Sequence, residues 1–137
     1  MASDIFVDTS GFYALLIQGD ACHADAGKVL HAARKSKRRF VTTDYVLDET
    51  ATLLKARGFG HLLAQVFDAI EQSGVCRVEW TDAERFFATR AFFLKHADQA
   101  WSFTDCLSFQ VMKQLRLREA LTKDAHFQAA GFEVLLK

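Results

Sequence analysis

Short apolar runs alternate with longer segments of helical spacing along this chain. The runs are too short for helices and predict strands at 5–7, 40–42, 76–80, 120–122 and 134–136. Between them, apolar residues recur every three or four positions. One such stripe is Phe59, Leu62, Leu63, Val66, Phe67 and Ile70, and another is Ala83, Phe86, Phe87, Ala91 and Leu94. The alternation predicts crossover helices and an α/β fold with a mainly parallel five-stranded sheet.

The segment from 44 to 73 predicts a helical hairpin. Lys55 and Arg57 precede Gly58 near its middle. Cations in the last turn followed by Gly are typical of a helix end, because Gly adopts the left-handed conformation and cations complement the helix dipole. We therefore expect helices over about 44–57 and 59–73.

Length and composition favour one compact domain spanning 1–137. Half of the 137 residues are apolar and 13 are Phe, which excludes a disordered chain. Lys plus Arg and Asp plus Glu both total 17, so no global field points to a nucleic-acid or other charged partner. The absence of Pro supports short connections between elements.

The cysteines and the N-terminal residues indicate a protein of the cytoplasm. Cys22, Cys76 and Cys106 are odd in number and contain no C-x-x-C pair, which disfavours both a disulfide framework and a zinc site. Asp4 lies where a signal peptide needs basic residues, and no apolar run reaches the ~18 residues of a membrane span. We expect reduced, mostly buried thiols and a cytoplasmic location.

Carboxylates follow the predicted strands. Asp8 comes directly after the first strand and Asp124 after the fourth, so both are expected at the same edge of a parallel sheet. Asp105 starts the helix that leads into the fourth strand, and Glu49 lies about one turn into the helix after the second. Each Asp could instead cap a helix, and Glu49 could be a solvated residue with Asp48 as an equal candidate. Helix capping does not explain why these acids should converge on one edge.

A cluster of carboxylates remains ionised only if cations neutralise it. Oxygen ligands suit Mg²⁺ or Mn²⁺, which bind phosphate oxygens and activate water. The four acids therefore predict a metal-dependent reaction on a phosphodiester. With them set aside, 13 acidic residues face 17 basic ones, so the remaining surface is mildly basic.

Four segments that contain these acids resemble the PIN-domain nucleases, especially the VapC-like toxins of type II toxin–antitoxin systems. They are Phe-Val-Asp-Thr-Ser-Gly at 6–11, Val-Leu-Asp-Glu-Thr at 46–50, Ser-Phe-Thr-Asp-Cys at 102–106 and Leu-Thr-Lys-Asp-Ala-His-Phe at 121–127. The resemblance spans most of the chain and selects Glu49 over Asp48. Many relatives place a Pro near the second strand, which this chain lacks.

The resemblance implies a three-layer α/β/α sandwich and a Mg²⁺- or Mn²⁺-dependent endoribonuclease. Asp8, Glu49, Asp105 and Asp124 would be the catalytic, metal-holding acids. Thr9, Ser10 and Thr104 would be possible polar helpers. It also implies an RNA substrate, a homodimer and a small antitoxin. Any part of the Phe59-to-Ile70 stripe that the sheet leaves uncovered would suit self-association or an antitoxin helix.

Other functions remain open at this point. A PIN nuclease could process RNA without an antitoxin. A receiver-like signalling domain would need adjacent acids after the first strand, whereas Thr9 follows Asp8 here. A catalytically silent interaction module would have no need of all four acids.

Several further residues have both a structural and a functional interpretation. The cations at 34–39 are either a solvated helix end or a phosphate-binding patch, at the edge opposite the acids. Trp101 could stack on a base or pack locally. His126, two residues after Asp124, could touch substrate or metal-bound water, or pack a short helix. Alternative contacts to RNA are Arg85, Arg90, Lys113, Arg116 and Lys123.

Overall fold

A single parallel sheet organises the molecule. The computed structural model describes residues 3–137, and its strands are β1 (Ile5–Val7), β2 (Phe40–Thr43), β3 (Cys76–Glu79), β4 (Glu119–Leu121) and β5 (Glu133–Val134). They lie in the order β3-β2-β1-β4-β5, and each neighbouring pair is parallel. The predicted α/β fold is confirmed, and each strand overlaps its predicted run.

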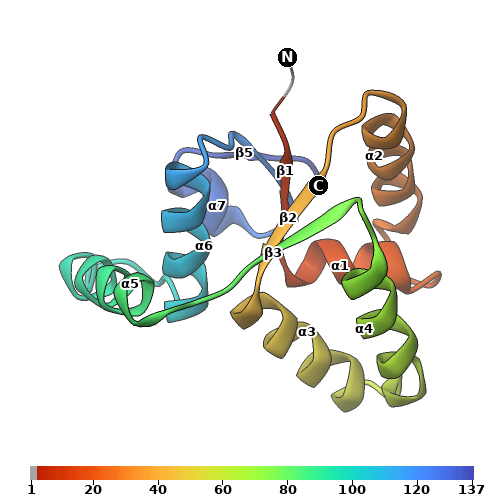
Figure 1. Cartoon of the computed structure of the whole chain (residues 1–137), viewed down its shortest axis with the longest axis horizontal. Coiled ribbons are helices and arrows are strands. Elements are labelled where there is room, and N and C mark those ends of the chain that lie inside the picture. Colours follow the sequence, from red (N-terminus) through yellow and green to blue (C-terminus); the bar gives the residue numbers. More distant parts are fainter. Residues whose placement is uncertain (1–2) are drawn as a thin grey trace.

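Helices cover both faces of the sheet (Figure 1). They are α1 (Thr9–Leu16), α2 (His23–Lys35), α3 (Asp44–Ala56), α4 (Leu63–Gln72), α5 (Ala83–Lys95), α6 (Phe103–Gln114) and α7 (Ala125–Ala129), with a 3-10 turn η1 (Gly60–Leu62). Helices α1, α2 and α4 lie on one side of the strands and α6 and α7 on the other. This is the three-layer α/β/α arrangement that the family resemblance implied. Among residues 3–137, no helix is both long and apolar enough to cross a membrane.

The predicted helical hairpin forms, but its second helix begins later than the predicted residue 59: Gly60–Leu62 form the 3-10 turn η1, and α4 begins at Leu63. Helix α3 ends at Ala56, and Gly58 adopts a φ of +86°, which an L side chain rarely adopts. Helix α4 buries Val66 and Ile70 against the core, while Phe67 is 36% exposed. The sheet and its neighbours therefore cover most of this apolar stripe.

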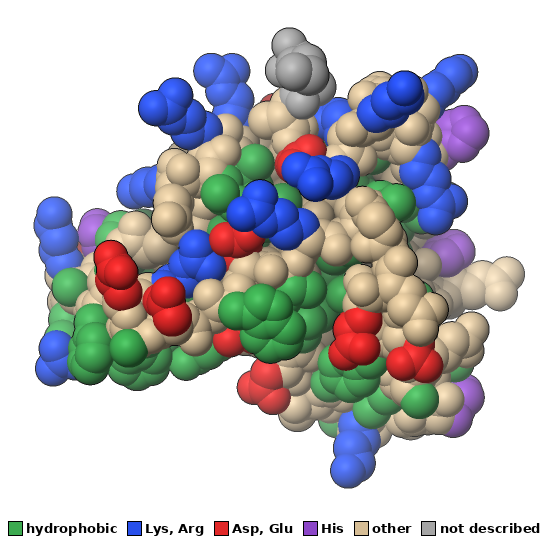
Figure 2. Space-filling view, in the orientation of Figure 1, with side chains coloured by type: hydrophobic (Ala, Val, Ile, Leu, Met, Phe, Trp, Pro, Cys, Tyr) green, Lys and Arg blue, Asp and Glu red, His purple; other side chains and the backbone are tan. Residues whose placement is uncertain are grey.

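The second apolar stripe faces outward instead. Phe87 is 64% exposed, Leu94 54% and Phe86 38%. Helix α5 packs on α6 rather than on the sheet, and Thr89 is its buried residue. Figure 2 shows hydrophobic side chains on the surface over α5. Helical spacing alone identified an apolar face here but not what that face contacts.

The central strands position the site. Strands β1 and β2 are buried along their whole length, which is typical of parallel strands covered on both faces. The chain leaves β1 toward β2 on one side and later returns to place β4 on the other, so strand order reverses between β1 and β4. In open α/β sheets, ligand sites lie beyond the carboxyl ends of strands at such a reversal.

Gly11 permits a close approach between α1 and β4. A Cβ atom at this position would lie 2.0 Å from the backbone oxygen of Leu121. Any larger residue would push the start of α1 away from the end of β4. The glycine therefore brings the residues that follow β1 against those that follow β4.

Candidate active site

Asp8 lies directly after β1, where the order of the strands reverses. Asp8 is 5% exposed. It is the N-cap residue of α1, but its side chain makes no capping hydrogen bond to that helix. The pKa of Asp8 is raised from 3.8 to about 7, mainly by burial and also by the charges of Asp105 and Glu49. Hydrogen bonds from the Thr9 backbone N–H and the Thr122 hydroxyl partly offset this rise. The helix-cap interpretation thus does not account for Asp8.

Thr122 connects the two strand ends. Its hydroxyl donates to Asp8 Oδ2 at 3.1 Å and accepts from the backbone N–H of Asp124 at 3.0 Å. Because the hydroxyl proton is directed to Asp8, the Ser10 hydroxyl donates to Thr122 Oγ1 at 2.9 Å and accepts from the Lys123 N–H at 3.0 Å. The carboxylate after β1 is therefore fixed to the loop after β4.

Asp105, Asp124 and His126 form a compact group next to Asp8. One ligand atom from each lies within 4.8 Å of the others. His126 Nδ1 is 3.0 Å from Asp105 Oδ2 and 3.5 Å from Asp124 Oδ1. Asp105 and Ser102 form the capping box at the start of α6, and Asp124 caps α7 by accepting from the His126 N–H at 2.9 Å. Capping therefore positions both carboxylates within this group.

Glu49 joins the group from across the cleft. It is exposed on α3 and lies with Asp8 and Asp124 in the wall of an open cleft of about 500 Å³. Asp48, the competing candidate, is not among the residues that line this cleft. The structure thus brings together all four acids that the sequence analysis selected. Among residues 3–137, the basic side chain within 4.0 Å of their carboxylates is the imidazole of His126.

The expected polar helpers differ in their placement. Ser10 lines the cleft and bonds Thr122, and Thr9 lines it and accepts from the Thr50 hydroxyl at 3.4 Å. Thr104 lies in α6, where its carbonyl accepts from Ser108, and it is not among the residues that line the cleft.

Two basic residues of the cleft differ in how far sequence could identify them. Both Lys123 and Arg57 line the cleft. The sequence analysis named Lys123 as a possible contact to RNA, but it identified Arg57 only as a cation at the end of a helix. The Arg57 guanidinium lies 4.9 Å from the centre of the Tyr13 ring, which holds it at the cleft wall. Thr122 also escaped notice, although its place two residues before Asp124 in the strand-end motif was a usable signal.

The other candidates contribute to packing or lie elsewhere. Trp101 packs against Phe92, Phe109 and His96, so its local-packing interpretation is correct. The cations at 34–39 begin in the last turn of α2 and continue to the start of β2, at the edge opposite Asp8. The three cysteines are free, and burial raises the pKa of Cys76 and of Cys106 to about 11, which keeps these thiols protonated.

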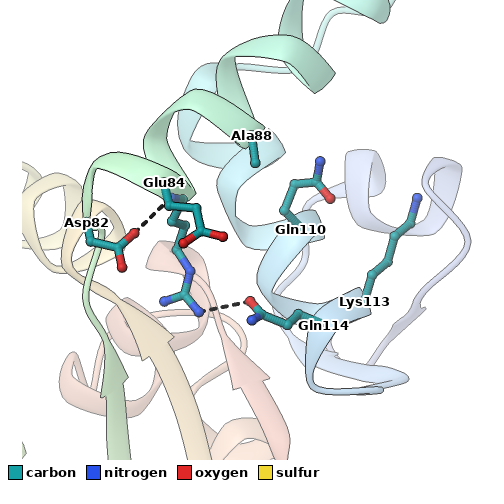
Figure 3. Close-up of a pocket in the computed structure, with 7 residues that line it drawn as sticks. Asp82, Glu84, Ala88, Gln110, Lys113 and Gln114 are labelled. Carbon is teal, nitrogen blue, oxygen red and sulfur yellow. Dashed lines mark hydrogen bonds between the residues drawn. The ribbon is translucent and has the colours of Figure 1, made fainter.

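A second cleft lies between the start of α5 and the end of α6 (Figure 3). Arg85 donates to Gln114 at 2.9 Å and to Glu79 at 3.1 Å, and its backbone N–H bonds Asp82. Its guanidinium is thus paired within the protein. This cleft shows a structural network and no converging set of reactive groups.

The chemistry of the first cleft suits a divalent cation. Its acids include one that burial holds against ionisation, and oxygen and imidazole donors lie close enough to share one ion. A bound cation would favour the ionised carboxylates and attract phosphate oxygens. The residues present therefore fit the Mg²⁺ or Mn²⁺ ion that the family resemblance implies.

Comparison with known proteins identifies the family. The PIN domain profile matches residues 5–133. The 23S rRNA-specific endonuclease VapC20 of Mycobacterium tuberculosis is 40% identical over 128 residues, which cover 93% of this chain and 95% of that protein. A VapC ribonuclease of Archaeoglobus fulgidus is 32% identical over 124 residues, covering 88% and 77% of the two chains.

Solved structures agree as well. The crystal structure of M. tuberculosis VapC20, described as a sarcin-ricin loop cleaving toxin, has a TM-score of 0.80 and 38% identity, covering 94% of this chain and 96% of that one. FitAcB from Neisseria gonorrhoeae shares the fold, with a TM-score of 0.65, 18% identity and 95% coverage of each chain. This chain therefore belongs to the PIN-domain family and, within it, to the VapC ribonucleases.

Proposed function

We propose that this protein, acting as a single domain, is a Mg²⁺- or Mn²⁺-dependent endoribonuclease of the cytoplasm and the toxin of a toxin–antitoxin pair. The observation that supports it best is the buried Asp8, whose pKa is about 7 because burial and two neighbouring acids oppose its ionisation. A protein has little reason to keep such a costly group unless a cation binds there.

Asp8, Glu49, Asp105 and Asp124 would hold the metal. When bound, the ion would lower the pKa of a water molecule and neutralise charge on the scissile phosphate. Thr122 fixes the Asp8 carboxylate through its hydroxyl, and the capping box fixes Asp105. Arg57 and Lys123, at the cleft wall, would bind RNA phosphates.

RNA cleavage with and without metal tests the proposal. We expect cleavage in Mg²⁺ or Mn²⁺, none in excess chelator, and a loss of at least 100-fold in Asp8→Asn and Asp105→Asn. Asp98→Asn, an exposed acid after α5, is the matched control and should retain full activity. Activity that survives both site substitutions or chelation would contradict the proposal.

The sarcin-ricin loop of 23S rRNA is the substrate to test first, since VapC20 carries that activity in its name and matches nearly the whole chain. An oligonucleotide with this stem-loop is compared with one whose loop sequence is scrambled. Selective cleavage of the stem-loop would show that this protein shares the substrate of VapC20. Equal cleavage of the stem-loop and the scrambled oligonucleotide would exclude that specificity.

We also propose a small antitoxin as partner. The chain purified with a tag from its own cells should bring down a small protein in stoichiometric amount, and the purified pair should cleave RNA more slowly than the free chain. A chain that purifies alone and active would instead favour the alternative of an RNA-processing nuclease without an antitoxin.

The homodimer would use the outward stripe of α5 rather than the hairpin. Phe87 and Leu94 are more than half exposed there, whereas the hairpin buries Val66 and Ile70. Light scattering should find a dimer, and Phe87→Ser should yield monomers with unchanged secondary structure. A monomer at high micromolar concentration of the unmodified protein would contradict the dimer.

A further inference from the structure

The imidazole of His126 lies inside the group of acids. Its Nδ1 atom is 3.0 Å from Asp105 Oδ2 and 3.5 Å from Asp124 Oδ1. Adjacent ligands around an octahedral ion with bonds of about 2.1 Å lie about 3 Å apart. The nitrogen is therefore spaced from both carboxylates as a third ligand of the same ion would be.

Neither carboxylate depends on the imidazole for its position. Asp105 Oδ2 accepts from the Ser102 backbone N–H at 3.1 Å, and the Ser102 hydroxyl accepts from the Asp105 N–H in return. Asp124 Oδ1 accepts from the backbone N–H of His126, which would persist with another side chain. The starts of α6 and α7 therefore already position the two carboxylates, so His126 is not needed for that purpose.

We propose that His126 Nδ1 is a metal ligand and that it biases this site toward Mn²⁺ over Mg²⁺. This inference rests on the metal site of the proposed function. Mg²⁺ strongly prefers oxygen donors, whereas transition-metal ions accept imidazole readily. Ligation requires the neutral tautomer with its proton on Nε2, and the side chain is 40% exposed, so solvent can reach it.

The test is pulsed electron paramagnetic resonance on the purified full chain with Mn²⁺ alone. A ligating imidazole gives a ¹⁴N coupling on the bound Mn²⁺, which we expect in the unmodified protein and not in His126→Asn. Asn keeps similar bulk and offers an oxygen in place of the nitrogen. His31→Asn, on the exposed face of α2, is the matched control and should keep the coupling.

Calorimetric titration with each ion provides the second readout. His126→Asn should lower Mn²⁺ affinity about tenfold and Mg²⁺ affinity much less. Bound Mn²⁺ without ¹⁴N coupling in the unmodified protein would overturn this inference and leave the proposed function standing. An equal loss of Mn²⁺ and Mg²⁺ affinity in His126→Asn would do the same. Failure of Mn²⁺ and Mg²⁺ to bind at all would overturn the proposed metal site together with the inference.

Discussion

Replacing Asp8 with Asn should stabilise the metal-free protein while it abolishes activity. Asp8 is 5% exposed and has Asp105 and Glu49 as charged neighbours, so its ionisation is opposed in the folded state. Asn has nearly the same shape, and its amide oxygen can still accept from the Thr122 hydroxyl. The substitution removes the charge without removing the hydrogen bond.

The pKa of Asp8 gives the magnitude and the sign. It is about 7 in the folded protein and 3.8 when unperturbed. Between these values the folded state holds a proton that the unfolded state has lost, so stability falls as pH rises from about 4 to 7. Each pKa unit corresponds to about 1.4 kcal/mol, so ionisation of Asp8 lowers the free energy of unfolding by about 4 kcal/mol in full. About 2.5 kcal/mol of this loss develops between pH 5 and pH 8.

Urea denaturation in excess chelator measures this effect. The stability advantage of Asp8→Asn over the unmodified protein should grow by about 2.5 kcal/mol from pH 5 to pH 8. Asp98→Asn should show no such growth. Saturating Mn²⁺ should reverse the order at pH 8, because ion binding to the folded state stabilises the protein that binds it more tightly. An advantage that is the same at both pH values would refute the reasoning.

Further substitutions probe the frame of the site. Gly11→Ala should destabilise by roughly 2–4 kcal/mol in urea, because its Cβ would meet the Leu121 oxygen at 2.0 Å, whereas Gly27→Ala, in open space on α2, should stabilise by up to about 1 kcal/mol. Ser102→Ala should lower stability by about 1 kcal/mol on thermal unfolding, since it removes the cap of α6. Arg57→Ala should raise KM for RNA about tenfold with a smaller change in kcat, and Arg90→Ala, on exposed α5, should leave both unchanged.

Local pattern identified the elements because each is specified by residues close in sequence. Runs such as Ile5–Val7 have few alternatives to a buried strand, and the Lys55-to-Gly58 order ends a helix by its own backbone preferences. Parallel strands place their carboxyl ends at one edge, so Asp8 and Asp124 could be paired without coordinates. Glu49 required the family resemblance, because Asp48 is equally plausible by spacing.

Packing between distant elements decided the rest. The hydrogen bond from Thr122 to Asp8 spans 114 residues, and the close approach of the His126 imidazole to Asp105 depends on how α7 meets α6. The outward stripe of α5 followed from its packing on α6 instead of the sheet.

The sequence by itself determined which elements form and which acids reach one edge of the sheet, since periodicity and strand direction are local properties of the chain. Only the tertiary structure decided that Asp8 is buried among other acids and that an imidazole enters their group. The physical reason is that desolvation and electrostatic repulsion depend on which atoms surround a carboxylate, and those atoms come from strands and helices far apart in the sequence.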